Sequence, residues 1–276
     1  MIIDFHTHSH ASDGTLSPCE LLQRAREAGV CKLAITDHDT VSGYAALRDS
    51  GQTADDITLI PGAELSCTWG KTAIHVVGLG MDVDHSGFVA QLSALDSARA
   101  QRAGIIAAKL EKIGMPGALE GATRHAGGSQ LARPHFAAWM VEAGYSRDAS
   151  QAFDRYLGSG KLGDVKTLWP VMEDVVSAIR GAGGTAVLAH PLNYRLTRTR
   201  LRACVAAFVA AGGEAIEVYS GRQDSAQVRQ LCTLAADFGL AVSGGSDFHG
   251  YRDYGPRLGF DTAMLPDDAR LLEPAK

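Results

Sequence analysis

Histidines and acidic residues gather in one run near the N-terminus, DFHTHSHASDG, which spans residues 4–14. His6, His8 and His10 stand two residues apart in it, and Asp13 follows. Histidine is otherwise sparse, with 10 in 276 residues. Side chains two residues apart on an extended strand point to the same side, so an HxH pair can reach one metal ion. HxH alone is a weak signal, because a single buried histidine is more often a hydrogen-bonded core residue than a ligand.

Further histidines and acids stand in or near later strand-like runs, mostly where the run ends. They are His38 in TDHD, Glu64 in PGAE, His75 in AIHVV, His190 in AHP, Glu217 in IEVY, and Asp247 and His249 in SDFH. In a parallel α/β barrel the C-terminal ends of the strands meet at one face, so these side chains are expected to converge. Imidazole and carboxylate groups together suit zinc, manganese and iron. Because buried ionisable groups without partners are costly, the convergence favours a metal centre over unrelated core residues.

Seven short apolar runs predict the strands that carry these side chains. They are residues 2–6, 33–36, 57–64, 73–79, 185–190, 215–219 and 241–246. Each run is almost continuously apolar, which is typical of parallel strands covered on both faces. Helical stretches at 173–181, 201–211 and 225–238 precede the last three. The alternation predicts an α/β fold with a parallel sheet, and seven units fit a barrel better than most open sheets.

The first helix has both of its ends marked in the sequence. The run SPCE, from Ser17 to Glu20, is a capping box with proline at the first helical position. Gly29 follows the apolar stripe and predicts the end of the helix.

A long gap separates the fourth predicted strand from the fifth. Within it, residues 92–113 and 131–143 have helical composition. We expect residues 84–165 to form an α-helical insertion that binds substrate, in a loop at the catalytic end of the barrel. Residues 1–83 and 166–276 are then expected to form the barrel that binds metal.

The composition is that of an ordinary globular protein, with 46% hydrophobic and 21% charged residues. The net charge of −5 argues against a broad nucleic-acid surface and a duplex partner, although it allows a local phosphate site. The five cysteines form no CxxC motif and are expected to be free thiols. No signal peptide or membrane-spanning run is visible, so we expect a cytoplasmic protein without an obligate protein partner.

The motifs DFHTHSHASDG, AITDHD, PGAELS, LAHP and GSDFHG, in this order, resemble those of the PHP (polymerase and histidinol phosphatase) superfamily. The runs WGKTAIHVVGLG, LARPHFA and YLGSGK are similar to a bacterial branch of that superfamily. The branch contains 3′,5′-nucleotide bisphosphate phosphatases and 5′-to-3′ exoribonucleases that act on short RNA. The resemblance implies a distorted (β/α)7 TIM-like barrel and metal-dependent hydrolysis of nucleotide phosphates.

The resemblance also implies a centre of three divalent ions, often manganese, with iron or zinc as alternatives. One ion would take His6, His8, Glu64 and Asp247; a second Asp13, His38 and His249; a third Glu64, His75 and His190. Glu217 and His10 fall outside this set. The implied substrate contacts are Arg99, Arg102, Arg133, Pro134 and His135, and the implied catalytic residues are Asp13, His38, His249 and His135. Asp13 and His135 are the candidates to protonate the leaving oxygen. Pro134 stands where the branch often has threonine, so it leaves the exact substrate open.

Three alternatives stay open at this point. A metal-dependent amidohydrolase shares the opening HxH, but such enzymes commonly bridge two metals with a lysine, and no lysine lies at a predicted strand end. A histidinol phosphatase would differ in the insertion. A non-catalytic PHP module of the kind attached to some DNA polymerases would have lost ligands, whereas all nine positions are filled here.

Overall fold

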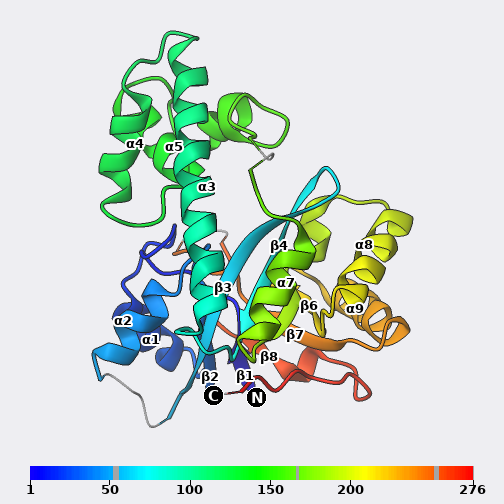
Figure 1. Cartoon of the computed structure of the whole chain (residues 1–276). Coiled ribbons are helices and arrows are strands. Elements are labelled where there is room, and N and C mark those ends of the chain that lie inside the picture. The colour runs from blue at the N-terminus through cyan, green and yellow to red at the C-terminus, as the bar shows by residue number, and fades with distance from the viewer. Residues whose placement is uncertain (52–55, 166–167, 252–254, 276) are drawn as a thin grey trace. The chain divides into compact units, whose positions relative to one another are not determined.

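The computed structural model describes residues 1–51, 56–165, 168–251 and 255–275. The chain forms two compact units. The first consists of Met1–Leu92 with Pro170–Lys276, and the second of Ser93–Trp169 (Figure 1).

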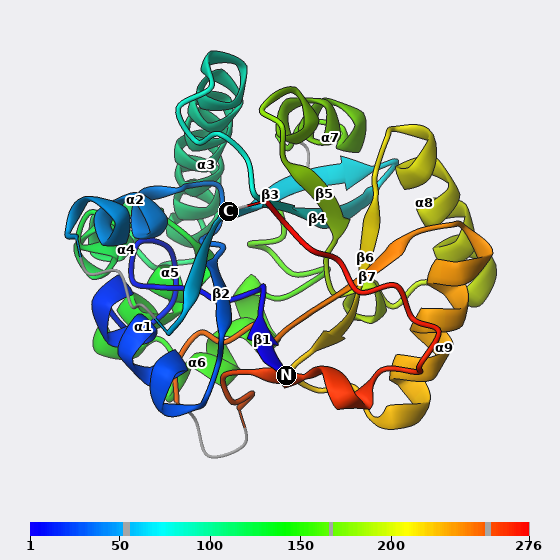
Figure 2. The same cartoon turned by 90° about the horizontal axis from the view of Figure 1, so that it is seen from below.

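The first unit is built around one sheet whose strands follow one another in chain order. Among the described residues the order is β7-β6-β5-β4-β3-β2-β1-β8. The strands are β1 Ile2–Asp4, β2 Lys32–Ile35, β3 Thr58–Trp69, β4 Thr72–Leu79, β5 Thr185–Leu188, β6 Ala215–Ser220, β7 Ala241–Gly245 and β8 Phe260–Asp261. Backbone hydrogen bonds also join the segment that follows β1 to the end of β7 and to the residues after it, from Phe5 N–H to Gly244 O at 3.2 Å and from Asp247 N–H to His6 O at 2.8 Å. The sheet therefore curls into a nearly closed barrel, as predicted (Figure 2).

The expectation that every strand is parallel is wrong for β4. It pairs antiparallel with both β3 and β5. A two-residue connection, Gly70-Lys71, joins Trp69 to its partner Thr72, and Gly70 adopts a positive φ of 58° that suits such a hairpin. Apolar runs look alike in parallel and antiparallel strands, so the apolar pattern alone could not show the direction.

The reversal changes where two site residues lie. Glu64 is inside β3, which continues to Trp69, and is not at the end of the strand as expected. Because β4 is antiparallel to β3, the N-terminal part of β4 pairs with the C-terminal part of β3, and His75 pairs with Ser66. His75 therefore reaches the same face as residues at the C-terminal ends of the parallel strands.

Helices cover the outside of this barrel (Figure 2). They are α1 Pro18–Glu27, α2 Ser42–Asp49, α7 Met172–Gly181, α8 Arg198–Ala210 and α9 Ser225–Asp237. The predicted capping box of α1 is confirmed, since Glu20 N–H donates to Ser17 Oγ at 3.2 Å and Ser17 N–H donates to Glu20 Oε2 at 2.9 Å. Leu21 and Ala25 of α1 pack on Leu33 of β2 in one buried cluster.

The second unit is helical. It contains most of α3 Ser86–Glu111, with α4 Ala118–Ala126, α5 Arg133–Glu142, α6 Ala149–Ala152 and a π-helical turn at Phe153–Leu157. Its core includes Leu110, Phe136 and Trp139. Gly121 of α4 lies so close to Trp139 that a Cβ there would stand 1.9 Å from the indole, so only glycine allows this approach of the two helices. That this unit binds substrate stays a prediction.

All five cysteines are free, as expected, and Cys67, Cys204 and Cys232 are buried. Within the described part of the chain, no helix has both the length and the apolar character needed to cross a bilayer.

Candidate metal centre

The structure brings the nine predicted ligands together in one cluster. Their ligand atoms fall into four overlapping groups, and the atoms of each group lie within 4.8 Å of one another. The groups are His6, His8 and Asp247; His8, Asp13, His38 and His249; His6, Glu64 and His190; and His38, Glu64 and His75. No described residue outside the nine belongs to any of these groups.

The opening HxH pair faces two carboxylates, as an extended strand end allows. The Nε2 atoms of His6 and His8 are both 3.3 Å from Glu64 Oε2. They lie 3.6 and 3.4 Å from Asp247 Oδ1. This is the set that the resemblance implies for the first ion.

Asp13, in the loop after β1, lies close to three imidazole rings. Its Oδ1 is 3.3 Å from His249 Nε2, 3.9 Å from His38 Nε2 and 3.9 Å from His8 Nδ1. Burial opposes ionisation of Asp13, but the neighbouring imidazoles outweigh it and hold its pKa well below the usual range. Burial likewise opposes protonation of His249, but Asp13 and Asp247 together outweigh it and raise the pKa of His249 to about 9. His8 thus offers one nitrogen to each of two groups, which the sequence did not indicate.

Glu64 lies at the centre of the cluster and is fully buried. Its Oε1 is 2.7 Å from both His75 Nδ1 and His190 Nε2, and its Oε2 is 2.9 Å from His38 Nδ1. Burial raises the pKa of this carboxyl, but the coulombic effect of His38 and the other imidazoles is larger and holds it well below its ordinary value. A carboxylate with both oxygens among imidazoles has the arrangement of a ligand that bridges two cations.

The polar atoms of the cluster test whether a divalent cation fits it. Several buried side-chain atoms of the predicted ligands make no hydrogen bond within the described structure. They are His6 Nε2, both ring nitrogens of His8, Asp13 Oδ1, His38 Nδ1, Glu64 Oε2 and His190 Nδ1. Buried polar atoms are nearly always hydrogen-bonded, so this concentration needs an explanation. Nitrogen and oxygen donors that converge without hydrogen-bonding one another fit metal cations.

Backbone strain also occurs at the cluster of predicted ligands. Non-glycine residues with positive φ include Asp39 at 55°, His190 at 25° and Asp247 at 53°. His190 and Asp247 are predicted ligands, and Asp39 follows the ligand His38. Such conformations cost about 1–3 kcal/mol each and cluster at functional sites.

Two buried aspartates that the sequence did not single out hold the ligand-bearing segments. Asp4 accepts hydrogen bonds from Ser246 N–H at 2.8 Å, Ser246 Oγ at 2.7 Å and Gly259 N–H at 2.7 Å. Burial raises the pKa of Asp4 to about 6, against the opposing effect of these bonds. Asp37 accepts from Ser9 N–H at 2.7 Å and from Ser12 Oγ at 2.6 Å. Their position beside predicted ligands, in DFH and TDHD, was the signal available in the sequence.

His10 and Glu217, which the implied ligand set leaves out, differ from each other in burial and in their contact with the cluster. His10 is exposed and belongs to none of the four groups. Glu217 is buried beside the cluster and hydrogen-bonds to it, without belonging to a group.

The predicted substrate residues lie in the second unit. Arg99 and Arg102 of α3 both place their guanidinium groups over the Trp169 ring, 5.4 and 5.3 Å from its centroid. The two side chains therefore share one face of the helix, as their spacing predicts. Arg102 Nε also donates to Val165 O at 2.9 Å.

The start of α5 carries the other three. Arg133 Nη1 donates to Leu157 O at 3.0 Å. Pro134 occupies the first turn, where a missing N–H costs nothing. His135 Nδ1 accepts from Ala132 N–H at 3.0 Å, so a neutral His135 ring carries its proton on Nε2. That these side chains contact substrate stays a prediction.

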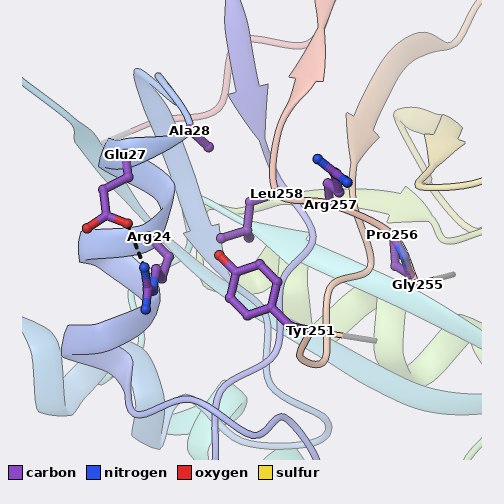
Figure 3. A pocket seen from close by; sticks show the side chains of 8 residues that line it. All are labelled: Arg24, Glu27, Ala28, Tyr251, Gly255, Pro256, Arg257 and Leu258. Carbon is purple, nitrogen blue, oxygen red and sulfur yellow. Dashed lines mark hydrogen bonds and ion pairs between the residues drawn. The ribbon is translucent and has the colours of Figure 1, made fainter. Parts of the chain in front are cut away.

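A pocket of about 480 Å³ lies apart from the predicted ligands, beside α1 (Figure 3). It is lined by Arg24, Glu27, Ala28, Tyr251, Gly255, Pro256, Arg257 and Leu258. Arg24 forms an ion pair with Glu27, whose carboxylate lies 2.9 Å from Arg24 Nη1. The lining contains none of the predicted site residues.

Several known proteins are similar to this chain in sequence and in fold. The family model of the PHP domain matches residues 4–116. A 5′-3′ exoribonuclease Rnm of Escherichia coli is 42% identical over 90% of this chain and 85% of its own. A 3′,5′-nucleoside bisphosphate phosphatase of Chromobacterium violaceum is 37% identical over 99% of both chains.

Solved structures agree with this. One from Chromobacterium violaceum, described as an amidohydrolase with bound sulfate and no metal, has a TM-score of 0.85 at 37% identity and covers 98% of this chain and 93% of its own. Another from Bifidobacterium adolescentis, described as a metal-dependent phosphoesterase, has a TM-score of 0.79 at 27% identity, with 95% and 93% covered.

Proposed function

The chain belongs to the PHP domain family, and we propose that it is a metal-dependent phosphoesterase that acts on nucleotide phosphates. The observation that carries the proposal is the buried cluster of imidazoles and carboxylates, several of whose polar atoms make no hydrogen bond in the described structure. The names of the two relatives supply the substrate class. We propose the 3′-phosphate of 3′,5′-bisphosphonucleotides as the first substrate and short 5′-phosphorylated RNA as the second.

We propose that the cluster holds three divalent ions, with manganese as the resident metal. His6, His8, Glu64 and Asp247 would hold one, Asp13, His38 and His249 another, and Glu64, His75 and His190 the third. His8 Nδ1 would add a ligand to the second ion, since it lies 3.9 Å from Asp13. Ions bound there would supply Lewis acidity that activates water and neutralises phosphate charge.

The chain's own residues would orient and bind the ester. The guanidinium groups of Arg99, Arg102 and Arg133 match phosphate oxygens as paired donors. Asp13, His38 and His249 lie together and would assist proton movements at the reacting oxygens. His135, whose Nε2 carries the proton in the neutral ring, is the candidate to protonate the leaving oxygen. Asp13, the other candidate from the sequence, fits this role less well, because its pKa lies well below the usual range and the carboxyl has no proton to donate near neutral pH. The described site residues include no serine or cysteine in a nucleophilic arrangement, so we propose direct attack by water.

One structural neighbour is described as an amidohydrolase, so hydrolysis of C–N bonds is the alternative activity to compare. Such sites commonly use a bridging lysine at the end of a middle strand, and none of the described strands ends in a lysine. The same neighbour holds sulfate, an anion with the tetrahedral shape of phosphate. Both observations favour the phosphoesterase.

The test is hydrolysis by the manganese-loaded protein. We expect phosphate release from a 3′,5′-bisphosphonucleotide to exceed release from histidinol phosphate, and amide substrates to stay intact. Glu64→Gln and His6→Ala should each lose activity by about 10²-fold or more, with less bound metal. The matched control is His125→Ala, which removes a histidine paired with Glu142 outside the cluster. Full metal content and full activity in both cluster variants would exclude the proposed centre.

A further inference from the structure

We propose that Glu217 is a positioning residue of the metal centre, which orients the His6 ring and fixes the His190 backbone with one carboxylate. The inference rests on the proposed metal site. It adds a residue outside the implied ligand set to the machinery that holds the ligands.

Both carboxylate oxygens of Glu217 are already engaged. Oε1 lies 2.9 Å from His6 Nδ1, and Oε2 accepts from His190 N–H at 2.6 Å. Glu217 belongs to none of the groups of convergent ligand atoms. With one oxygen on each neighbour, the side chain has the contacts of a support for ligands.

The position of Glu217 in the barrel makes these contacts necessary. It is 3% exposed, in β6. Ala215, two residues before Glu217 on the same face of the strand, packs in the apolar cluster that includes Ile3 and Val187. A carboxylate on that face is costly unless it is hydrogen-bonded. The two contacts offset the cost, and they couple the end of β1 to the segment that follows β5.

The contact to His6 determines which nitrogen faces the other ligands. A carboxylate accepts, so Nδ1 of His6 is the nitrogen that carries hydrogen toward Glu217. Nε2 is then left facing Glu64 Oε2 at 3.3 Å and Asp247 Oδ1 at 3.6 Å, without a hydrogen bond. A carboxylate behind a metal-binding histidine sets the tautomer and the ring orientation in this way.

The contact to His190 steadies a strained residue. β5 ends at Leu188, so His190 lies beyond the strand, with φ at 25° and ψ at 59°. Its N–H donates to Glu217, and its ring Nε2 lies 2.7 Å from Glu64 Oε1. An unfavourable backbone conformation persists only where its surroundings determine it, and Glu217 supplies one such restraint.

The first measurement uses the full-length wild-type protein loaded with zinc, a diamagnetic ion. Nitrogen-15 NMR of labelled histidine, assigned with His6→Ala, should show hydrogen on Nδ1 of His6 and metal on Nε2. Metal on Nδ1, or hydrogen on Nε2, would overturn the inference without any change to Glu217.

The second measurement compares Glu217→Gln with wild type by calorimetric titration of manganese and zinc. The amide replaces one of the two acceptor oxygens with an NH2 donor, so it cannot accept from His6 and His190 in the positions that Oε1 and Oε2 occupy. We expect metal affinity to fall about 10–100-fold for at least one ion. We also expect a changed visible spectrum of the cobalt-substituted protein. Tyr219→Phe is the matched control, since it alters a polar group in the same strand, two residues from Glu217, and should change neither quantity.

The outcomes separate the two proposals. If wild type binds metal and Glu217→Gln binds it with the same affinity and the same cobalt spectrum, Glu217 has no positioning role and the proposed function stands. If wild type binds no divalent metal, both the proposed centre and this inference are wrong. A lower melting temperature alone, with unchanged metal binding, would indicate a merely structural role and would also overturn the inference.

Discussion

The opening histidines look equivalent in the sequence but lie in different environments. His6 and His8 are buried among carboxylates, whereas His10 is exposed. Strand spacing alone would place all three on one side. The chain turns after Ser9, however, where Ser12 N–H and Gly14 N–H both donate to Ser9 O, and His10 leaves the cluster.

His10→Ala and His75→Ala test this division. His10→Ala should keep the full metal content, because its side chain faces solvent. His75→Ala should lose metal, since it removes a nitrogen 2.7 Å from Glu64 Oε1. Metal analysis after dialysis, with activity in parallel, measures both. Loss of metal in His10→Ala with full retention in His75→Ala would reverse the assignment.

Gly245 permits the close approach of β7 to the opening segment. A Cβ at this position would stand 2.4 Å from His6 N. We expect Gly245→Ala to lower the free energy of unfolding by about 1–3 kcal/mol and to weaken metal binding, because the backbone of His6 must shift. Gly181→Ala is the control, since a Cβ there meets nothing within 4 Å. Denaturant unfolding and metal titration together check the prediction, and equal behaviour of the two variants would contradict it.

Residue types were enough to predict which side chains converge, but not what supports them. Eight of the nine predicted ligands are histidines and acids in or near the predicted strands, which a pattern can reveal, whereas Asp13 was predicted as a ligand only through the family resemblance. Asp4 and Ser246 bond across 242 positions of the chain. Glu217 contacts two ligands far from it in sequence. Such pairings depend on which strands become neighbours, which no local pattern contains.

At the scale of elements, the β3–β4 hairpin is the main difference from the expected fold. The strands themselves were predicted from their apolar runs, while their antiparallel pairing was missed. The signal was the Gly70-Lys71 pair between two such runs, a dipeptide that suits a two-residue hairpin with glycine first. The reversal brings His75 to Glu64.

Gly70→Ala tests the importance of that turn. An L-residue at φ 58° is strained, so the free energy of unfolding should fall by about 1–2 kcal/mol. A Cβ there has open space, so the loss would come from the backbone alone. Lys71→Ala, at the neighbouring turn position, should change stability by less than about 0.5 kcal/mol. Urea denaturation of both variants is the measurement, and a Gly70→Ala protein as stable as wild type would argue against a strained turn.

At the scale of the whole chain, the cluster links distant segments of the barrel. Its ligands come from segments near β1, β2, β3, β4, β5 and β7, which span residues 6–249. Removal of metal should therefore destabilise the whole first unit. A ligand at 100 times its dissociation constant stabilises the native state by about 2.7 kcal/mol.

Chelation should consequently lower the melting temperature by roughly 5–10 °C, and added manganese should restore it. Differential scanning calorimetry at several metal concentrations measures the shift. In Glu64→Gln the shift should shrink, whereas His125→Ala should keep it. A melting temperature that is independent of chelator and metal in wild type would contradict a centre held by these residues.

The two units predict a separation of metal binding from substrate binding. All nine predicted metal ligands belong to the first unit, and Arg99, Arg102 and Arg133 belong to the second. Arg99→Ala and Arg133→Ala should therefore keep the metal content of wild type. Each should lower kcat/KM for a 3′,5′-bisphosphonucleotide about 10–100-fold, because a hydrogen bond to a charged group contributes about 1.5–3 kcal/mol. Arg124→Ala, which removes an exposed arginine paired with Glu142 in the same unit, should leave kcat/KM unchanged.

Circular dichroism would first establish that each variant is folded, since Arg99 is buried over Trp169. Wild-type kcat/KM in both folded variants would exclude the arginines from substrate binding, and loss of metal from either would show that the units do not act separately.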